Sequence, residues 1–260
     1  MQPKLIKDKS TLLILGGTGE ALSLMSTISE QFGNQLRIIY SLAGCTKKPV
    51  HRGGEIRIGG FGGIKGLQEF LYLEKVKYLI DATHPFAKNI SANALFAAKE
   101  ADIPYIYLNR KEWSAGTNDQ WHHVEDISAA AEVIPKLGVR VFLTLGPRAL
   151  EYFKLLNKTW FLVRLIDKPE KVLPLLNAEI ILDRGPFNYK SEFDLLVKYK
   201  IDVIVTRASG GKATFQKLLA ARELQVPVIM IRRPPLLDAE SATSKEEFIC
   251  WLNKRINFSV

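Results

Sequence analysis

Thiols are scarce in this chain, and long apolar runs are missing from it. Its two cysteines, Cys45 and Cys250, lie far apart and fit no metal-ligand spacing, so we interpret both as free thiols. The four histidines show no such spacing either, and no metal site is predicted. No apolar run approaches the ~18 residues of a membrane-spanning helix. The polar residues 1–10 precede an apolar run of only residues 12–15, too short for a signal-peptide core. We therefore expect a cytoplasmic protein with no membrane partner.

Several signature motifs are also missing. The chain has no G-x-S-x-G elbow and no G-x-x-x-x-G-K-[ST] loop, which disfavours a serine hydrolase and a P-loop nucleotidase. It has no helix-turn-helix, zinc-finger or RNP-type signature, so no nucleic-acid partner is expected. The net charge is +9, and the basic residues are scattered rather than gathered in a block. That excess fits either a plain basic surface or the attraction of an anionic ligand.

What the sequence does contain is an alternation of short apolar runs with helical patterns, typical of a parallel sheet covered on both faces. Strands are predicted at residues 11–16, 36–42, 55–58, 76–82, 104–108, 139–145, 160–166, 178–182, 202–206 and 226–231. Helices are predicted at residues 20–32, 65–73, 87–101, 127–137, 148–156, 192–199, 214–224 and 245–255.

A polar stretch at residues 109–125 breaks the alternation once. We therefore predict an α/β protein of two tandem Rossmann-like domains with mostly parallel sheets. The first, residues 1–118, is expected to bind a dinucleotide, and the second, residues 119–260, the substrate. Ligands of such sheets lie beyond the carboxyl ends of the strands, so an interdomain cleft is the expected site.

The first predicted strand runs directly into a glycine-rich turn. The turn comprises Gly16, Gly17, Thr18, Gly19 and Glu20. Such a turn brings the backbone close to a phosphate, and the free N–H groups of the following helix favour an anion. Gly17 and Gly19 fit the first pair of the G-x-G-x-x-G fingerprint, but Leu22 occupies the third place. A glycine turn without a ligand is the alternative.

The second predicted strand ends without the acidic residue that usually binds a free ribose 2′-hydroxyl. Its end reads Ser41, Leu42, Ala43 and Gly44, and Lys47, Lys48 and Arg52 follow. Positive side chains at this point suit a 2′-phosphate, which favours NADPH and leaves NADH possible. A solvated basic loop explains the same residues.

Two more segments of the first half are candidates for cofactor contact. Residues 59–63 hold four glycines around Phe61, including Gly60 and Gly62, and so many are costly in entropy unless the backbone passes close to a ligand. A surface loop is the alternative reading. Thr83 and His84 follow a predicted strand and are expected to face the cleft. His84 is a candidate catalytic proton donor, or a purely structural residue.

In the second half, arginines recur at predicted strand ends. Arg148, Arg184 and Arg207 each follow such a strand. Because an arginine fork binds carboxylates in bidentate fashion, several on one rim indicate a polycarboxylate ligand. Each arginine taken alone is explained by a surface ion pair.

One of these strand ends continues into a second candidate anion nest. It is made of Ser209, Gly210 and Gly211, with Lys217 on the helix that follows. This places a second anion-binding turn in the half of the chain that is expected to hold the substrate.

Taken in order, these motifs resemble the precorrin-6A reductase family of cobalamin biosynthesis. The resemblance is carried by LILGGTGEA, SLAG, GGFGG and DATHPFA in the first half, and by RGPF, SGG-x-x-T, K-L-x-A-A-R and P-V-x-M-x-x-RPP in the second. It spans residues 12–235. It departs from the family at Cys45, where the family often has an arginine, and at Arg207 and Ala208, where the family often reads lysine and asparagine.

The resemblance implies an oxidoreductase that reduces one double bond of precorrin-6A, or of cobalt-precorrin-6A, with NADPH or NADH. It implies that the cofactor is lined by the glycine turn, the 41–44 strand end, the 59–63 cluster, Thr83 and His84. The 209–211 nest and Lys217 would bind the carboxylates of the tetrapyrrole. A tandem-Rossmann transferase and a non-catalytic dinucleotide-binding module are the alternatives, and the oligomeric state stays open, a monomer included.

Overall fold

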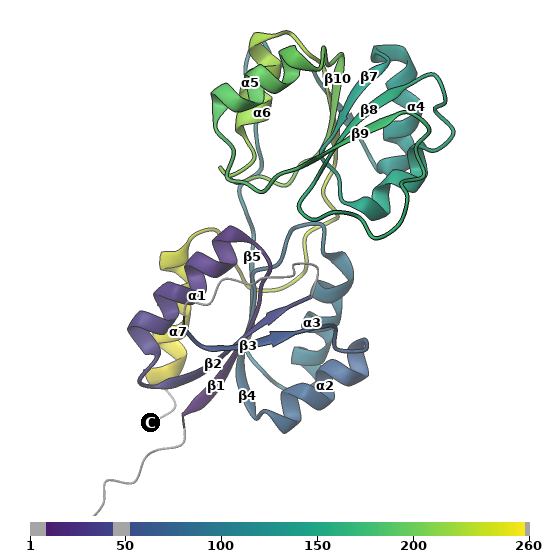
Figure 1. The fold of residues 1–260 in the computed structure, drawn as a ribbon. Helices are drawn as coiled ribbons and strands as arrows, with labels where there is room; N and C mark the ends of the chain where they lie inside the picture. Colours follow the sequence, from purple (N-terminus) through teal and green to yellow (C-terminus); the bar gives the residue numbers. More distant parts are fainter. Residues whose placement is uncertain (1–8, 44–52, 258–260) are drawn as a thin grey trace, which may run out of the picture. The chain divides into compact units, whose positions relative to one another are not determined.

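The chain forms two compact units in a computed structural model that describes residues 9–43 and 53–257. One unit consists of Met1–Arg110 with Pro234–Val260, and the other of Lys111–Arg233 (Figure 1). Each holds a six-stranded sheet in which every strand pair is parallel. The predicted α/β class with two Rossmann-like sheets is confirmed. Within the described part of the chain, no helix has the length and apolar character needed to cross a membrane.

The sheet of the first unit has the strand order β12-β5-β4-β1-β2-β3. Its strands are β1 (Ser10–Leu15), β2 (Leu36–Leu42), β3 (Glu55–Ile58), β4 (Val76–Asp81), β5 (Tyr105–Leu108) and β12 (Ser241–Ala242). Its helices are α1 (Gly19–Phe32), α2 (Ile64–Leu73), α3 (Lys88–Glu100) and α7 (Lys245–Asn257). The strand order reverses between β1 and β4, and sheets of this kind bind ligands at such a reversal.

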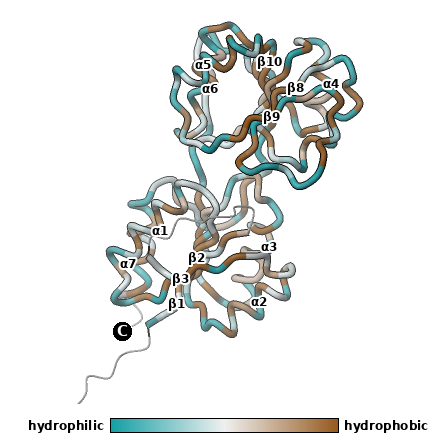
Figure 2. Tube along the Cα trace, viewed as in Figure 1, coloured by the Kyte–Doolittle hydropathy of each residue, from teal (hydrophilic) through white to brown (hydrophobic). Residues whose placement is uncertain are grey.

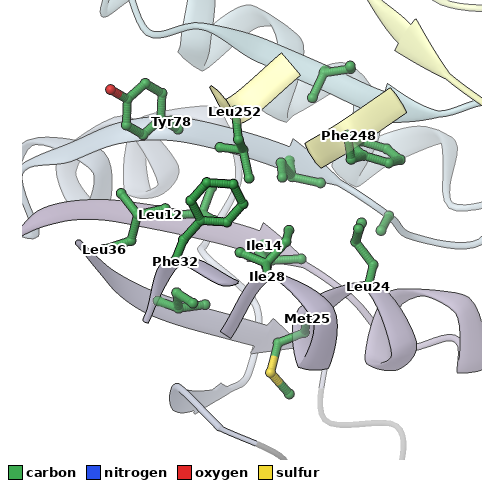
Figure 3. Packing of buried hydrophobic residues seen from close by; sticks show 14 of the residues in the cluster. Leu12, Ile14, Leu24, Met25, Ile28, Phe32, Leu36, Tyr78, Phe248 and Leu252 are labelled. Atoms are coloured by element: carbon green, nitrogen blue, oxygen red, sulfur yellow. The ribbon is translucent and has the colours of Figure 1, made fainter. Parts of the chain in front are cut away.

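The core of the first unit lies on both faces of β1, because successive side chains of a strand point to opposite sides. Leu12 and Ile14 pack in one cluster with Ile28 of α1 and Phe248 of α7 (Figure 3). Leu13 belongs to a second cluster with residues of α2 and α3. Burial on both faces explains why the strands are nearly continuous in apolar residues (Figure 2).

The second unit repeats this arrangement with the strand order β6-β11-β10-β7-β8-β9. Its strands are β6 (Trp121–Val124), β7 (Arg140–Leu143), β8 (Trp160–Leu165), β9 (Ala178–Leu182), β10 (Val203–Arg207) and β11 (Val228–Ile231). Its helices are α4 (Ile127–Leu137), the 3-10 helix η1 (Pro147–Phe153), α5 (Tyr189–Lys198) and α6 (Gln216–Glu223). The order reverses between β7 and β10, which therefore marks the corresponding ligand position of this sheet.

The division into units differs from the expected domain boundary in two ways. The expected junction lay between residues 118 and 119, whereas the second unit begins at Lys111. The last segment of the chain was expected in the second domain but belongs to the first unit. There β12 pairs with β5, Asn109 N–H donates to the Ala242 carbonyl at 2.9 Å, and Phe248 of α7 is fully buried. Packing of this segment against the first sheet determines the division.

Three elements were not predicted in their observed form. β6 was missed because two of its four residues, His122 and His123, are exposed and polar. β12 is a two-residue strand with no periodic pattern of its own. Residues 148–156 were predicted as an α-helix, but the observed element is η1, which ends at Phe153.

Candidate dinucleotide and substrate sites

The glycine turn and the end of β4 meet at the strand reversal of the first unit. Thr18 is the N-cap of α1, and its Oγ1 accepts a hydrogen bond from Ala21 N–H at 3.1 Å. The same hydroxyl donates to the Ala82 carbonyl at 3.2 Å. Thr18 therefore caps the helix and holds the two loops together, as an N-cap threonine can do with its one donor and two acceptor sites.

The three glycines of the turn differ in how far a side chain could be accommodated at each. A Cβ on Gly16 would lie 2.3 Å from the ring of the buried Tyr40. Gly17 has a φ of +109°, which side-chain-bearing residues rarely adopt, and its N–H donates to the Tyr40 hydroxyl at 3.2 Å. A Cβ on Gly17 or Gly19 would meet no atom within 4 Å. The turn is thus packed against Tyr40 at Gly16 and has open space at Gly17 and Gly19, where a phosphate could approach the backbone.

Glu20 introduces a negative charge into the first turn of α1. It pairs with Arg110, whose Nη2 lies 3.5 Å from Glu20 Oε2. The side chain of Arg110 is 8% exposed, and burial lowers its pKa although the charge of Glu20 acts in the opposite direction. The pairing offsets the repulsion that a free carboxylate would exert on an anion at this helix end.

The glycine cluster at residues 59–63 is organised by Arg57, a residue that the sequence patterns did not single out. Arg57 Nη1 donates to the Gly59 carbonyl at 2.5 Å, and Nη2 donates to the Gly60 carbonyl at 2.8 Å. Its guanidinium carbon lies 3.8 Å from the ring centroid of Phe61. Arg57 is hard to identify from the sequence, because a single arginine in a short strand belongs to no recurring pattern.

A buried carboxylate lies below the end of β4. Asp81 is 3% exposed and accepts hydrogen bonds from Thr83 N–H at 3.0 Å, from the Thr83 hydroxyl at 2.6 Å and from the Tyr105 hydroxyl at 3.1 Å. Burial, reinforced by the negative charge of Asp81, raises the pKa of Tyr105, so this phenol stays a donor. The hydroxyl of Thr83, a predicted cofactor contact, is therefore held by the protein itself.

His84 lies half-buried beyond this network. Its Nδ1 accepts a hydrogen bond from Phe86 N–H at 3.2 Å. In a neutral imidazole the nitrogen that accepts carries no proton, so the proton lies on Nε2. The loop thereby orients a potential N–H donor at the end of β4.

The turn at residues 209–211 lies at the strand reversal of the second unit. Gly210 and Gly211 have φ values of +66° and +79°, as an anion nest requires. Trp113 Nε1 donates to the Gly211 carbonyl at 2.8 Å. A Cβ on Gly210 would lie 2.4 Å from Arg233 Nη2 and from the Lys111 carbonyl. One side of the predicted nest is therefore filled by the segments at the two ends of this unit.

Lys217, predicted to bind substrate carboxylates, is buried. It is 3% exposed, and its ammonium donates to the Thr214 carbonyl at 2.8 Å. Arg164 and Glu192 form a buried bidentate ion pair close by, with hydrogen bonds of 2.6 and 3.1 Å. Burial lowers the pKa of Lys217 to about 7, with Glu192 opposing the shift and Arg164 adding to it. Its ammonium lies 5.4 Å from the centroid of the Trp113 ring, and the indole of Trp113 donates to the Gly211 carbonyl, so Lys217 lies in the interior of the unit rather than on its surface.

The predicted arginines of the second unit are divided between surface and interior. Arg148 and Arg184 are exposed, at the start of η1 and just after β9. Arg207 is partly buried, and burial lowers its pKa. Arg148 and Arg184 are therefore the more accessible of the three to a carboxylate ligand.

Part of the predicted cofactor segment falls between the two described stretches of the chain. Gly44, Cys45, Lys47, Lys48 and Arg52 lie outside the described residues. Within residues 9–43 and 53–257, no three His, Cys, Asp or Glu side chains are grouped in a way that could hold a metal ion. Ser41 and Leu42 end β2, with Ala43 next in the chain, beside the glycine turn that they were predicted to accompany.

A parallel sheet with this strand order and a glycine turn at its reversal defines the class of Rossmann-type nucleotide-binding enzymes. Residues 11–253 match the family model described as Precorrin-6x reductase CbiJ/CobK, and the chain belongs to this family. The predicted identity as an oxidoreductase of the precorrin-6A reductase family in cobalamin biosynthesis is thereby confirmed.

Curated relatives match nearly the whole chain. A precorrin-6A reductase of Rhodococcus erythropolis is 44% identical over 93% of this chain and 96% of its own. A cobalt-precorrin-6A reductase of Synechocystis is 28% identical over 91% of this chain and 93% of its own. A solved structure named CobK precorrin-6A reductase superposes with a TM-score of 0.89 at 39% identity, covering 94% of this chain and 96% of the other.

Proposed function

We propose that the first unit binds NADPH and that the enzyme uses it to reduce precorrin-6A. Hydride from the nicotinamide and one proton add across a carbon–carbon double bond of the macrocycle, and NADP⁺ is released. The observation that carries this proposal is the glycine turn, packed against Tyr40 on one side and open at Gly17 and Gly19 on the other. The cofactor supplies the hydride chemistry, and the chain binds, orients and excludes water.

Within the first unit we assign the diphosphate to Gly16, Gly17, Thr18 and Gly19 and the start of α1, with Glu20 neutralised by Arg110. The end of β2 then faces the adenosine ribose, as in other sheets of this order. The 83–84 loop adjoins the same turn, because β4 pairs with β1, and the 60–62 loop lies one strand further along the sheet edge, because β3 pairs with β2. His84 is the proposed proton donor in its doubly protonated imidazolium form, in which Nδ1 no longer accepts from Phe86 N–H and Nε2 delivers the proton to the macrocycle.

We assign the macrocycle to the second unit. Precorrin-6A carries many carboxylates, and the exposed Arg148 and Arg184 are suited to bind them in bidentate fashion. Ser209 and Gly211 are the proposed backbone contacts of the nest. Gly210 is covered by Arg233 and Lys111, and Lys217 is buried inside the unit. Lys217 therefore shapes the nest rather than binding a carboxylate directly.

We propose the cobalt-free macrocycle as substrate. Relatives named precorrin-6A reductase are 39–44% identical to this chain over 86–93% of its length. Relatives named cobalt-precorrin-6A reductase are 28–36% identical. The higher identity supports precorrin-6A over its cobalt complex.

The test is a direct turnover assay with the purified protein. Precorrin-6A and cobalt-precorrin-6A are each mixed with NADPH and separately with NADH, and oxidation of the nicotinamide is followed by absorbance. We expect turnover that is fastest with precorrin-6A and NADPH. Binding of NADPH without oxidation in the presence of intact macrocycle would instead indicate a non-catalytic module, and faster turnover of the cobalt complex would reverse the substrate assignment.

A further inference from the structure

Arg57 places a guanidinium beside the carboxyl end of β2. In the β2–β3 pairing Arg57 lies opposite Ser41, and its Nη1 lies 3.3 Å from Ser41 Oγ. Further bonds lead from Nη1 to the Gly59 carbonyl and from Nη2 to the Gly60 carbonyl. These three bonds leave Nε–H and one Nη2–H of the five guanidinium donors for another acceptor.

Within residues 9–43 and 53–257, no carboxylate pairs with the guanidinium of Arg57. Among the residues that the structure describes, its partners are two carbonyls, one hydroxyl and the rings of Phe61 and Phe70. Burial lowers the pKa of Arg57. Arg37 on β2 differs sharply, because its guanidinium bonds the carboxylates of both Glu55 and Glu74. Arg57 is thus a partly buried cation, fixed in place, with electrostatic capacity for an anion.

Its position selects the anion. In a sheet of this order the second strand ends beside the adenosine ribose, where an acidic residue binds a free 2′-hydroxyl and an arginine accommodates a 2′-phosphate. The described end of β2 offers Ser41, Leu42 and Ala43, none of which is acidic. The adjoining guanidinium, stacked on Phe61 and therefore preorganised, has the planar fork that matches a phosphate.

We infer that Arg57 determines the preference for NADPH over NADH by binding the 2′-phosphate with its remaining donors. The inference rests on the proposed function, since it requires that the first unit binds a dinucleotide. It assigns the selectivity to a residue at the edge of the sheet, independently of Lys47 and Lys48.

The competing explanation is that Arg57 only supports the 59–60 loop. A supporting residue would affect both nucleotides equally, because they share every group except the 2′-phosphate. A residue that binds this phosphate affects NADPH alone.

The experiment measures dissociation constants of NADPH and NADH by calorimetry for the full-length protein and three variants. Arg57→Met keeps the aliphatic stem and removes the donors. Arg37→Met removes one positive charge from the same sheet at the opposite end of β2 and serves as the matched control. The third variant replaces Lys47 and Lys48 with Ala.

We expect Arg57→Met to weaken NADPH binding about tenfold or more and to leave NADH binding unchanged, since a hydrogen bond to a charged group is worth ~1.5–3 kcal/mol. Arg37→Met is expected to leave the ratio of the two constants as in the wild type. If Arg57→Met does not fold, as judged by circular dichroism, Arg57→Lys replaces it. That variant keeps the charge without the fork and is expected to weaken NADPH selectively, to a smaller extent.

Equal weakening of both nucleotides would overturn the inference and assign Arg57 to loop support. The inference would also be overturned if the preference for NADPH over NADH were lost in the double variant of Lys47 and Lys48 but kept in Arg57→Met. A wild-type protein that binds both nucleotides equally would contradict the inference alone. A wild-type protein that binds neither would contradict the proposed function, so the two failures are distinguishable.

Discussion

At the scale of single residues, Gly16 and Gly19 belong to one turn but limit substitution in opposite ways. A methyl group on Gly16 would overlap the buried ring of Tyr40, whereas one on Gly19 would enter open space. We expect Gly16→Ala to lower the free energy of unfolding by ~1–3 kcal/mol through overpacking. We expect Gly19→Ala to leave stability unchanged or raise it by ~0.4–1 kcal/mol, because alanine has less freedom in the unfolded chain.

The same pair of variants separates packing from binding. Gly19→Ala should weaken NADPH binding, since its methyl group occupies the space above the turn. Urea unfolding and calorimetric titration measure the two effects on the same preparations. Equal losses of stability in both variants would contradict the observed packing of the turn.

His84 allows a kinetic prediction. If its Nε2 delivers the proton, His84→Ala should lower kcat by ~10²–10⁴-fold, the usual contribution of a general acid. The dissociation constant of NADPH should change far less than kcat, because the diphosphate is assigned to the glycine turn and His84 is one contact among several along the cofactor. Steady-state kinetics and cofactor titration check both statements, and an unchanged kcat would exclude His84 as the donor.

Lys217 makes stability depend on pH. Its pKa is about 7 in the folded protein, against an ordinary value of 10.5. Between these values the unfolded chain binds the proton and the folded protein does not, so this group makes stability rise with pH from about 7 to 10.5. We expect the free energy of unfolding of Lys217→Met to exceed that of the wild type by most near pH 6, where the buried ammonium is charged. The difference should shrink toward pH 10.

Urea unfolding at several pH values tests this prediction. Lys212→Met, which removes an exposed lysine from the segment just before α6, is the matched control, and its stability should depend on pH as that of the wild type does. If the free energy of unfolding of Lys217→Met varied with pH as that of the wild type does, the pKa of Lys217 would not be lowered in the folded protein.

The residues of the candidate site differ in how far sequence could identify them. The glycine turn was predictable because strand, turn and helix are contiguous and each glycine has a local signature. Arg57 was not, because its relation to Ser41 depends on the pairing of two strands. The burial of Lys217 also escaped prediction, since α6 is short and does not present an evident apolar face that would have placed this lysine inward.

At the scale of elements, α7 completes the core of the first unit. Phe248 is fully buried against Leu12, Ile14 and Leu24 of the same cluster. Phe248→Ala should lower the free energy of unfolding by ~3–5 kcal/mol, the usual range for removing a buried phenylalanine. Cys250→Ala, at an exposed position of the same helix, should change it by less than ~0.5 kcal/mol. Comparable values for the two variants, measured by thermal or urea unfolding, would show that α7 does not seal this core.

Strands with continuous apolar sequence were predicted nearly to their observed ends. β1 was expected at residues 11–16 and spans Ser10–Leu15. Such a strand is recognisable because burial on both faces produces a continuous run of apolar residues, which a surface helix does not show. β6 and β12 are edge strands of the two sheets, and an edge strand needs few apolar residues. Their existence follows from the partner strand and not from their own sequence.

At the scale of the whole molecule, the two units differ in how the chain builds them. Lys111–Arg233 is a continuous segment, whereas the first unit uses two separate segments. We expect residues 111–233 to fold alone and to bind no NADPH. Residues 1–110 joined to 234–260 by a glycine-serine linker should fold and bind it, and residues 1–110 alone should not fold.

Circular dichroism and calorimetric titration of these three chains check the expectation. NADPH binding by residues 111–233 would contradict the assignment of the cofactor to the first unit. Cooperative unfolding of residues 1–110 alone would show that β12 and α7 are dispensable for that sheet.

The discontinuity of the first unit also has a consequence for synthesis. Domains tend to fold as they leave the ribosome, from the amino terminus onward. Here β1 to β5 need β12 and α7, which are translated only after the whole second unit, so Lys111–Arg233 is expected to reach its native state before the first unit does. Nascent β1 and β4 are therefore expected to depend longest on chaperones, and a stop codon placed directly after residue 233 would remove β12 and α7 from the first unit while leaving the second unit, Lys111–Arg233, complete.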